Sequence, residues 1–159
     1  MKFVLLLFNI QKNKNFGNLI RTANVFGVEE VCVVGRKGFS THGNQNTKLD
    51  TQFRHFYKMH EAFDFYAKLN YEFIGVEIGE SFRSINTHVF SRDSVFILGN
   101  ETSGIQAEII AQCDYCVYIP QFGSGASLNV NVACGIVLNA FVANKGQHNK
   151  IVDAKFVAP

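Results

Sequence analysis

Short apolar runs alternate along this chain with longer segments in which apolar residues recur every three or four positions. Continuous apolar runs are typical of strands buried on both faces of a sheet, and the longer recurrence is typical of amphipathic helices. The pattern predicts strands at residues 2–8, 30–34, 72–77, 94–98 and 115–119. It predicts helices at residues 16–26, 60–69, 105–113 and 128–143.

Strands that alternate with helices predict an α/β fold, in which a mainly parallel sheet carries helices on both faces. The first helix is well marked, because Phe16, Leu19 and Ala23 recur at helical spacing. Asn15 stands where its N-cap is expected. Two prolines and no Gly/Ser-rich linker predict a single domain over residues 1–159. Ligands of such folds bind where the strands end, so the loops there are the places to look for chemistry.

Length and composition narrow the class of protein. A chain of 159 residues with 47% hydrophobic and 18% charged residues is an ordinary globular domain. Its net charge of +2 excludes an indiscriminate polycation. The charge is unevenly spread, because residues 1–58 hold nine Lys and Arg against three acids, whereas residues 59–114 hold three against nine. The first segment therefore predicts a local basic surface that suits nucleic acid.

The sequence predicts neither a membrane segment nor a metal site. The apolar start is interpreted as a strand because no small-residue cleavage site follows it, and residues 128–143 fall short of the ~20 residues of a bilayer span. We therefore expect a cytoplasmic protein. The four cysteines are interpreted as buried free thiols, while Cys113 and Cys116 form a C-x-x-C that also suits redox chemistry or half a zinc site. No second pair at zinc-finger spacing accompanies them, so no metal is expected.

Two loops that follow predicted strands carry polar residues suited to ligand binding. The first, residues 9–21, enters a helix whose start offers free N–H groups, and Arg21 adds a planar guanidinium that suits phosphate. A solvated surface arginine is the alternative for Arg21. The second, residues 95–105, breaks a buried strand at Gly99 and places Glu101 between two glycines. Capping of the next helix is the alternative role for that carboxylate.

A third loop, residues 118–131, combines Pro120 with a glycine-rich stretch before Ser127, Leu128 and Asn129. Such a loop suits an anion at the start of the following helix. It matches neither the P-loop nor the dinucleotide fingerprint, because Leu128 stands where the last glycine belongs. The loop alone therefore leaves nucleotide binding open.

Taken in order, the three loops resemble the three motifs of the SpoU (TrmH) family of RNA 2′-O-ribose methyltransferases, in the SPOUT superfamily. The motifs read Asn15-Phe-Gly-Asn-Leu-Ile-Arg21, Leu98-Gly-Asn-Glu101-x-x-Gly104 and Ile119-Pro-x-x-Gly123-x-x-x-Ser127-Leu-Asn129. The resemblance covers residues 3–144, nearly the whole chain. It is similar in extent to the small tRNA wobble-ribose methyltransferases, which consist of the catalytic domain alone.

This resemblance implies a fold, a cofactor and a partner. The carboxyl-terminal region, about residues 94–144, is expected to form a trefoil knot, with residues 145–159 as a tail. S-adenosylmethionine is expected among the knot loops, at main-chain groups around these residues: Val76, Leu98, Gly99, Ile119, Ser127 and Leu128. Family members are homodimers with composite active sites, so a homodimer is expected.

The resemblance also implies catalytic positions. Methyl transfer needs a ribose 2′-hydroxyl that is aligned and relieved of its proton. Arg21 is expected to clamp a substrate phosphate and to activate that hydroxyl; a guanidinium holds its own proton too firmly for a base, so the proton acceptor is left open. The remaining motif residues are expected to orient Arg21, the loops and the ribose through hydrogen bonds. They are Asn15, Glu101, Ser127 and Asn129.

Basic residues outside the motifs are expected to contact RNA. Arg36 and Lys37 form a basic loop after the second predicted strand. Arg54 lies in a Phe-rich segment, residues 53–65, that suits stacking on exposed bases as well as core packing. These three cations extend the local basic surface around the Arg21 motif.

The sequence therefore indicates S-adenosylmethionine-dependent 2′-O-methylation of structured RNA, with tRNA favoured over rRNA. Asn131 and Gln121 stand where serine and methionine are common in the family, which leaves the choice of RNA open. One alternative is an RNA- or cofactor-binding protein of the same fold without turnover, against which Arg21, Glu101 and Asn129 argue. Another is a nucleotide-dependent oxidoreductase of Rossmann type, whose glycine fingerprint this sequence lacks.

Overall fold

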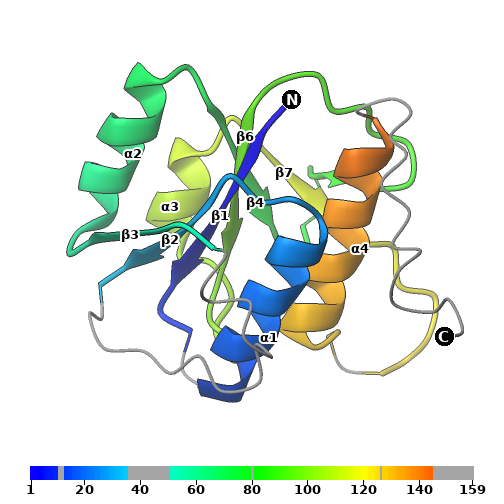
Figure 1. Cartoon of the computed structure of the whole chain (residues 1–159). Coiled ribbons are helices and arrows are strands. Elements are labelled where there is room, and N and C mark those ends of the chain that lie inside the picture. The colour runs from blue at the N-terminus through cyan, green and yellow to red at the C-terminus, as the bar shows by residue number, and fades with distance from the viewer. Residues whose placement is uncertain (11–12, 36–50, 80, 126, 145–159) are drawn as a thin grey trace, which may run out of the picture.

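A seven-stranded sheet forms the centre of the computed structural model, which describes residues 1–10, 13–35, 51–79, 81–125 and 127–144. The strand order is β3-β2-β1-β6-β4-β7-β5, and every pairing between neighbouring strands is parallel (Figure 1). The strands are β1 (Phe3–Phe8), β2 (Glu30–Val34), β3 (Phe53–Phe56), β4 (Glu72–Val76), β5 (Arg83–Ser84), β6 (Ser94–Leu98) and β7 (Tyr115–Tyr118). The predicted α/β class with a parallel sheet is confirmed.

Helices cover both faces of this sheet, as predicted. Those in the described part of the chain are α1 (Asn13–Val25), α2 (Met59–Lys68), α3 (Ala107–Gln112) and α4 (Val130–Ala143). α1 and α4 pack against each other on one face and share a buried apolar cluster with it, while α2 and α3 join a second cluster on the other face (Figure 1). No helix within these described residues has both the length and the apolar character to cross a bilayer.

The central strand β1 shows why a continuous apolar run indicates a strand that is buried on both faces of the sheet. Its residues from Phe3 to Leu7 are all at most 1% exposed. Because successive side chains point to opposite faces, Phe3, Leu5 and Leu7 enter the cluster under α1 and α4. Val4 and Leu6 enter the cluster under α2 and α3. In a strand buried on both faces, polar and apolar residues therefore do not alternate along the sequence.

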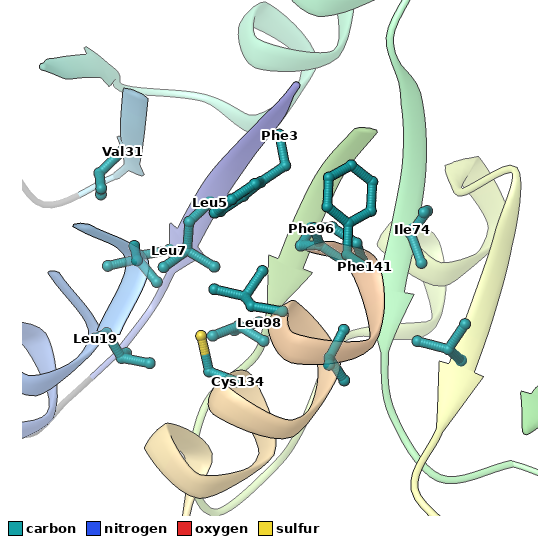
Figure 2. Close-up of a cluster of buried hydrophobic side chains, with 14 of the residues drawn as sticks. Phe3, Leu5, Leu7, Leu19, Val31, Ile74, Phe96, Leu98, Cys134 and Phe141 are labelled. Atoms are coloured by element: carbon teal, nitrogen blue, oxygen red, sulfur yellow. The ribbon is translucent and has the colours of Figure 1, made fainter. Parts of the chain in front are cut away.

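The core under α4 is built around aromatic rings. Phe141 of α4 meets Phe3 and Phe96 at centroid distances of 5.6 and 5.3 Å, with the rings edge to face. Figure 2 shows these rings beside Leu98 and Cys134, between β1, β6 and the helix. Edge-to-face pairs add about 0.5–1.5 kcal/mol each beyond the area that they bury. This packing fixes α4, and with it the loop that precedes α4.

Two strands were missing from the predicted pattern. β3 reads Phe-Arg-His-Phe, and its residues are only half-buried because it lies at the edge of the sheet. β5 has two residues and lies at the other edge. Edge strands carry polar side chains and make few buried contacts, so neither presents a continuous apolar run.

The connection from β4 to β6 includes the edge strand β5, on the far side of β7. The chain leaves β4, pairs as β5 at the edge of the sheet and returns to β6 on the other side of β4. β7 pairs with both β4 and β5, so it lies inside this excursion. After β7 the chain continues to α4, whose C-cap Asn144 accepts a hydrogen bond at 2.6 Å from the N–H of Phe90 in the excursion. The end of α4 is thereby tied to the segment between β5 and β6.

Candidate functional site

A cavity of about 590 Å³ opens where β4, β6 and β7 end. This volume lies within the ~300–1,000 Å³ of small-molecule sites. The six residues expected at the cofactor all line it: Val76, Leu98, Gly99, Ile119, Ser127 and Leu128. So do four of the five residues expected in catalysis: Asn15, Glu101, Ser127 and Asn129. The carboxyl ends of the parallel strands therefore bring all three motifs to one place.

The loop after β6 is a closed turn that forms one wall of the cavity. Asn100 and Gly104 exchange two backbone hydrogen bonds of 3.1 and 2.9 Å. The Asn100 side chain, whose residue is 6% exposed, accepts from the N–H groups of Thr102 and Ser103 at 2.8 and 3.0 Å. Its amide donates to the backbone oxygen of Asn9 after β1 at 3.0 Å. The loop is therefore held both internally and from the neighbouring strand.

Two glycines make this turn possible. Gly104 has φ +69°, a left-handed conformation that glycine adopts without strain. A side chain at Gly99 would collide with the backbone of Gly104 and the N–H of Ile105. The glycines at either end of the motif thus serve the close approach of two backbone segments, and the carboxylate of Glu101 is carried between them.

Asn15 connects the first helix to this loop. Its side-chain amide donates to Glu101 Oε1 at 2.9 Å, and the residue is 6% exposed. The prediction that Asn15 is the N-cap of the first helix is wrong, because α1 begins at Asn13 and Asn15 lies in its first turn. The tertiary bond to Glu101 determines the place of Asn15, and local helix signals could not reveal a partner 86 residues away. Helix α3 begins at Ala107, beyond the turn that carries Glu101.

The third motif closes the cavity from the side of α4. Asn129 is the N-cap of α4, and its Oδ1 accepts from the N–H groups of Asn131 and Val132 at 2.8 and 3.4 Å. Ser127 and Leu128 are exposed and line the cavity just before this cap. Because the cap fixes where the helix begins, it also fixes where these two residues meet the cavity.

Arg21 lies apart from the cavity, in a smaller hollow of about 230 Å³ between α1 and α4. Thr22 and Asn131 also line this hollow, and the Thr22 hydroxyl donates to Asn131 Oδ1 at 2.7 Å. The structure therefore groups four of the predicted catalytic residues around the cavity and places the fifth next to it. Asn129 and Asn131, at the start of α4, stand at the border between the two hollows.

The basic residues expected to contact RNA are only partly described. Arg36 and Lys37 lie outside the described residues. The Arg54 Nε donates to Glu30 Oε1 at 2.8 Å, and its guanidinium lies 4.2 Å from the centroid of the Phe65 ring. The hydrogen bond to Glu30 raises the pKa of Arg54. Arg54 is therefore engaged within the fold at the edge of the sheet, while its side chain stays 40% exposed.

The cysteines of the C-x-x-C pair are not among the residues that line the cavity. All four cysteines are free thiols, and the thiols of Cys113 and Cys116 converge on Gly75 of β4. The hydrogen bond between the two thiols lowers the pKa of Cys116 and raises that of Cys113. Among the residues that the structure describes, no group of three or more His, Cys, Asp or Glu is arranged to hold a metal ion.

Sequence reasoning missed several residues that shape the site. Glu77, directly after β4, accepts hydrogen bonds from the N–H groups of Ile78 and Ile105, each at 2.9 Å, and lines the cavity. Asn100 folds the loop after β6, and Thr22 links the two helices beside Arg21. One signal pointed to Glu77: a carboxylate that follows an apolar strand at its carboxyl end, where parallel sheets bind ligands. No comparable signal marks Thr22.

Comparison with known families points in the same direction as the motifs. A model of the SpoU rRNA Methylase family matches residues 2–139. The tRNA (guanosine(18)-2'-O)-methyltransferase of Thermus thermophilus is 27% identical over 136 residues, which cover 84% of this chain and 70% of that protein. The 23S rRNA (guanosine-2'-O-)-methyltransferase RlmB of Coxiella burnetii is 29% identical over 140 residues, 85% of this chain and 56% of that protein.

Length separates this chain from several of its relatives. The mouse tRNA (guanosine(18)-2'-O)-methyltransferase TARBP1 is 31% identical over 144 residues, which are 81% of this chain and only 8% of that protein. The chain thus spans between 8% and 70% of the length of these three relatives. What those proteins carry beyond the matched region has no counterpart in the alignment.

Solved structures share the fold. The SpoU methyltransferase AviRb of Streptomyces viridochromogenes, solved with AdoMet, has a TM-score of 0.83 and 21% identity, covering 91% of this chain and 60% of that one. The TrmH/SpoU tRNA modifying enzyme of A. aeolicus has a TM-score of 0.82 and 20% identity, covering 91% and 75%. A protein from work on the 2-OH methylation of C/U34 on tRNA has a TM-score of 0.78 and 21% identity, covering 91% and 96%.

Proposed function

The chain belongs to the SpoU rRNA methylase family, and from this premise we propose that it transfers a methyl group from S-adenosylmethionine to a ribose 2′-hydroxyl in structured RNA. One observation carries the proposal: the cavity at the strand ends is lined by all six positions expected at the cofactor and by the Asn15–Glu101 pair. A Rossmann-type oxidoreductase would need a glycine fingerprint that this chain lacks.

The cavity fits the cofactor in size and in chemistry. Its volume of about 590 Å³ suits a molecule of this kind, and its lining alternates apolar residues such as Leu98 and Ile119 with polar loop residues. Main-chain groups around Val76, Gly99 and Leu128 would hold the cofactor. When bound, S-adenosylmethionine supplies an electrophilic methyl group on a sulfonium. The residues of the chain supply the binding surface, the orientation and the exclusion of water.

We propose that Arg21 acts on the RNA rather than on the cofactor. It lines the hollow beside the cavity, where its guanidinium can clamp a phosphate with a planar pair of donors and activate the neighbouring hydroxyl. Asn15 and Glu101 link the helix that carries Arg21 to the cofactor loop through their 2.9 Å bond. Asn129 and Ser127, at the start of α4, would orient the ribose between the two hollows.

A homodimer completes the proposal. The outer side of α1 and α4 exposes Val25 to 72%, Val132 to 49% and Ile136 to 39%. Val25 lines the Arg21 hollow, and Val132 and Ile136 lie one turn apart on α4. A second copy that covers this face would bury these apolar residues and enclose Arg21. Sedimentation equilibrium should show a dimer that the double substitution Val132→Glu, Ile136→Glu dissociates; a wild-type monomer at working concentration would contradict it.

The proposed fold includes a trefoil knot in about residues 94–144. Support comes from the sheet order, because β7 lies between β4 and β5 although it follows both of them and β6 in the chain. The hydrogen bond from Phe90 to Asn144 ties the end of α4 to the segment between β5 and β6. A crystal structure that traces the whole segment would test this. The chain is knotted if the traced backbone cannot be straightened when its two ends are extended.

The substrate class that we propose is RNA, with tRNA favoured. Relatives act, by their names, on tRNA and on 23S rRNA, so the family alone does not choose. The size argument favours tRNA, because the neighbour from work on C/U34 methylation of tRNA matches this chain over 96% of its own length. We place this activity in the cytoplasm, in a single domain of residues 1–159.

The test is a methylation assay with a radiolabelled cofactor. Purified protein should label bulk tRNA more than rRNA, and RNA from cells that lack the protein should lose a 2′-O-methyl group at a mapped position. Calorimetry should show binding of S-adenosylmethionine and none of NAD. Cofactor binding without label on any RNA would favour a binding protein without turnover.

A further inference from the structure

Glu77 joins two walls of the cofactor cavity. It follows the last residue of β4, and one of its carboxylate oxygens accepts from the N–H of Ile78 at 2.9 Å. The other oxygen accepts from the N–H of Ile105 at 2.9 Å, at the far end of the loop that follows β6. One carboxylate therefore spans the gap between the end of β4 and the loop of the second motif.

The fit of this carboxylate is tight on the side of the loop. The position where a side chain of Gly104 would begin is occupied by Glu77 Oε2. Gly104 itself has φ +69°, so a side chain there would be strained as well as blocked by the carboxylate. The half-buried Glu77 lines the cavity between Val76, expected at the cofactor, and Ile78. Glu77 itself is a member of neither apolar cluster of the core, while Ile105, whose N–H it accepts, belongs to the cluster under α2 and α3.

We infer that Glu77 is a positioning residue for the cofactor, because it sets the distance between the carboxyl end of β4 and the Gly99–Gly104 turn. This inference rests on the proposed function. Without the carboxylate, the N–H of Ile105 and the N–H of Ile78 lose a shared acceptor, and the turn is no longer tied to β4. The main-chain groups around Val76 and Gly99 then no longer face the cavity at a fixed separation, so cofactor binding weakens while the RNA side of the site is untouched.

A carboxylate suits this role better than its closest substitutes. A carboxylate offers two acceptor oxygens and needs no donor partner, so it can serve two N–H groups at once. An amide in its place offers one oxygen and turns an NH₂ group toward one of the two N–H donors. Glu77→Gln should therefore keep one of the two bonds, and Glu77→Ala should keep neither.

The test measures cofactor binding by calorimetry in Glu77→Gln and Glu77→Ala. We expect Kd for S-adenosylmethionine to rise about threefold and about tenfold, respectively, since each lost bond is to a charged acceptor. The matched control is Glu29→Gln, an exposed glutamate before β2. Initial rates should show a raised KM for the cofactor with an unchanged KM for RNA. The melting temperature should fall by several degrees, and less in Glu77→Gln than in Glu77→Ala, because each lost bond also costs stability.

The outcomes separate this inference from the proposed function. A graded rise in Kd from wild type through Gln to Ala, absent in the control, supports the positioning role. Wild-type binding with an unchanged Kd in both variants overturns the inference and leaves the proposed function standing. An equal rise in the KM for RNA and in the KM for the cofactor also overturns it. A wild-type protein that binds no S-adenosylmethionine overturns both.

Discussion

The two hollows of the molecule are built in different ways. One wall of the cavity at the strand ends is a turn that is bonded to its neighbours: Asn100 folds the turn after β6, Glu77 ties that turn to β4, and Asn15 ties it to α1. The hollow at Arg21 is a gap between two helices, spanned by the bond from Thr22 to Asn131. The shape of the cavity is determined by backbone segments that hydrogen bonds hold in place. The shape of the Arg21 hollow is determined by side chains on an open surface.

This difference matches the two ligands of the proposed reaction. A small cofactor gains affinity from a site that is already shaped, because little ordering is needed when it binds. A folded RNA is large and brings its own shape, so one face of its site can remain open until the RNA and a second copy of the chain are present. The comparison therefore predicts that substitutions in the two regions affect different kinetic parameters.

Arg21→Ala should have the largest effect and should act on one region alone. We expect turnover to fall by about 10² to 10⁴, the usual range for a lost activating or charge-stabilising group. The Kd for S-adenosylmethionine should stay near the wild-type value. Arg21→Lys should lose most of the activity too, because a point charge cannot replace a planar pair of donors. Single-turnover transfer and calorimetry measure the two quantities separately; retained turnover would refute the role.

Gly99→Ala should damage the other region. The added methyl group would collide with the backbone of Gly104, so the turn must shift. We expect about tenfold weaker cofactor binding and a loss of about 1–3 kcal/mol in stability, the usual cost of overpacking. The control is Gly123→Ala, whose added methyl group meets open space. Calorimetry and thermal melting compare the pair, and equal behaviour of the two variants would contradict the tight turn.

Substitution of Asn15 should affect both regions, because its bond to Glu101 joins them. Asn15→Ala removes a hydrogen bond to a carboxylate, about 1.5–3 kcal/mol, so kcat/KM should fall about tenfold or more. Asn15→Asp should be worse, because it sets one carboxylate against another. Steady-state rates with each substrate varied in turn give the measurement. If Asn15→Asp is as active as wild type, the link does not matter.

Arg36 and Lys37 should affect RNA binding through charge alone. Replacing both by alanine should weaken RNA binding several-fold and lower the slope of log K against log salt by about one to two, since each phosphate contact contributes about 0.7–0.9. Lys68→Ala, an exposed lysine at the end of α2, serves as control. Filter binding at a series of salt concentrations measures the slope. An unchanged slope would count against a contact.

Asn131→Ser should have the smallest effect of the series. It restores the serine that is common in the family and removes the acceptor of the Thr22 hydroxyl, a bond worth about 0.5–1.5 kcal/mol. We expect a change of a few-fold at most in the KM for RNA and none in cofactor binding. Competition between tRNA and rRNA in one reaction shows whether the preference changes as well.

The sequence revealed most of the fold because the central strands are apolar on both faces. β1 and β6 are buried almost completely, and such runs are readable without any knowledge of their neighbours. The strand Phe53–Phe56 was missed for the opposite reason, since Arg54 and His55 give it the polarity of an edge. Composition and periodicity carry no information about which strands become edges.

The sequence predicted only some of the residues that form the candidate site. The resemblance named ten residues for the cofactor and for catalysis, and nine of them line a single cavity. The resemblance did not reveal Glu77 or Asn100, whose importance depends on backbone groups far away in sequence, the N–H of Ile105 for Glu77 and the oxygen of Asn9 for Asn100. Tertiary hydrogen bonds also decided the place of Asn15 inside α1. Local patterns predict elements, and partners far away in sequence decide what their polar residues do.

The position of helix α4 late in the chain determines when, during synthesis, the cofactor can bind. The helix supplies Cys134, Val137, Leu138 and Phe141 to the core, and the loop before it closes the cavity. A ribosome delivers the chain from its amino end, so a nascent chain that has emerged only as far as β7 has an uncovered sheet face and an open cavity. We therefore expect the cofactor to load only after α4 has left the exit tunnel, and a stalled, shorter chain to present apolar surface that chaperones recognise.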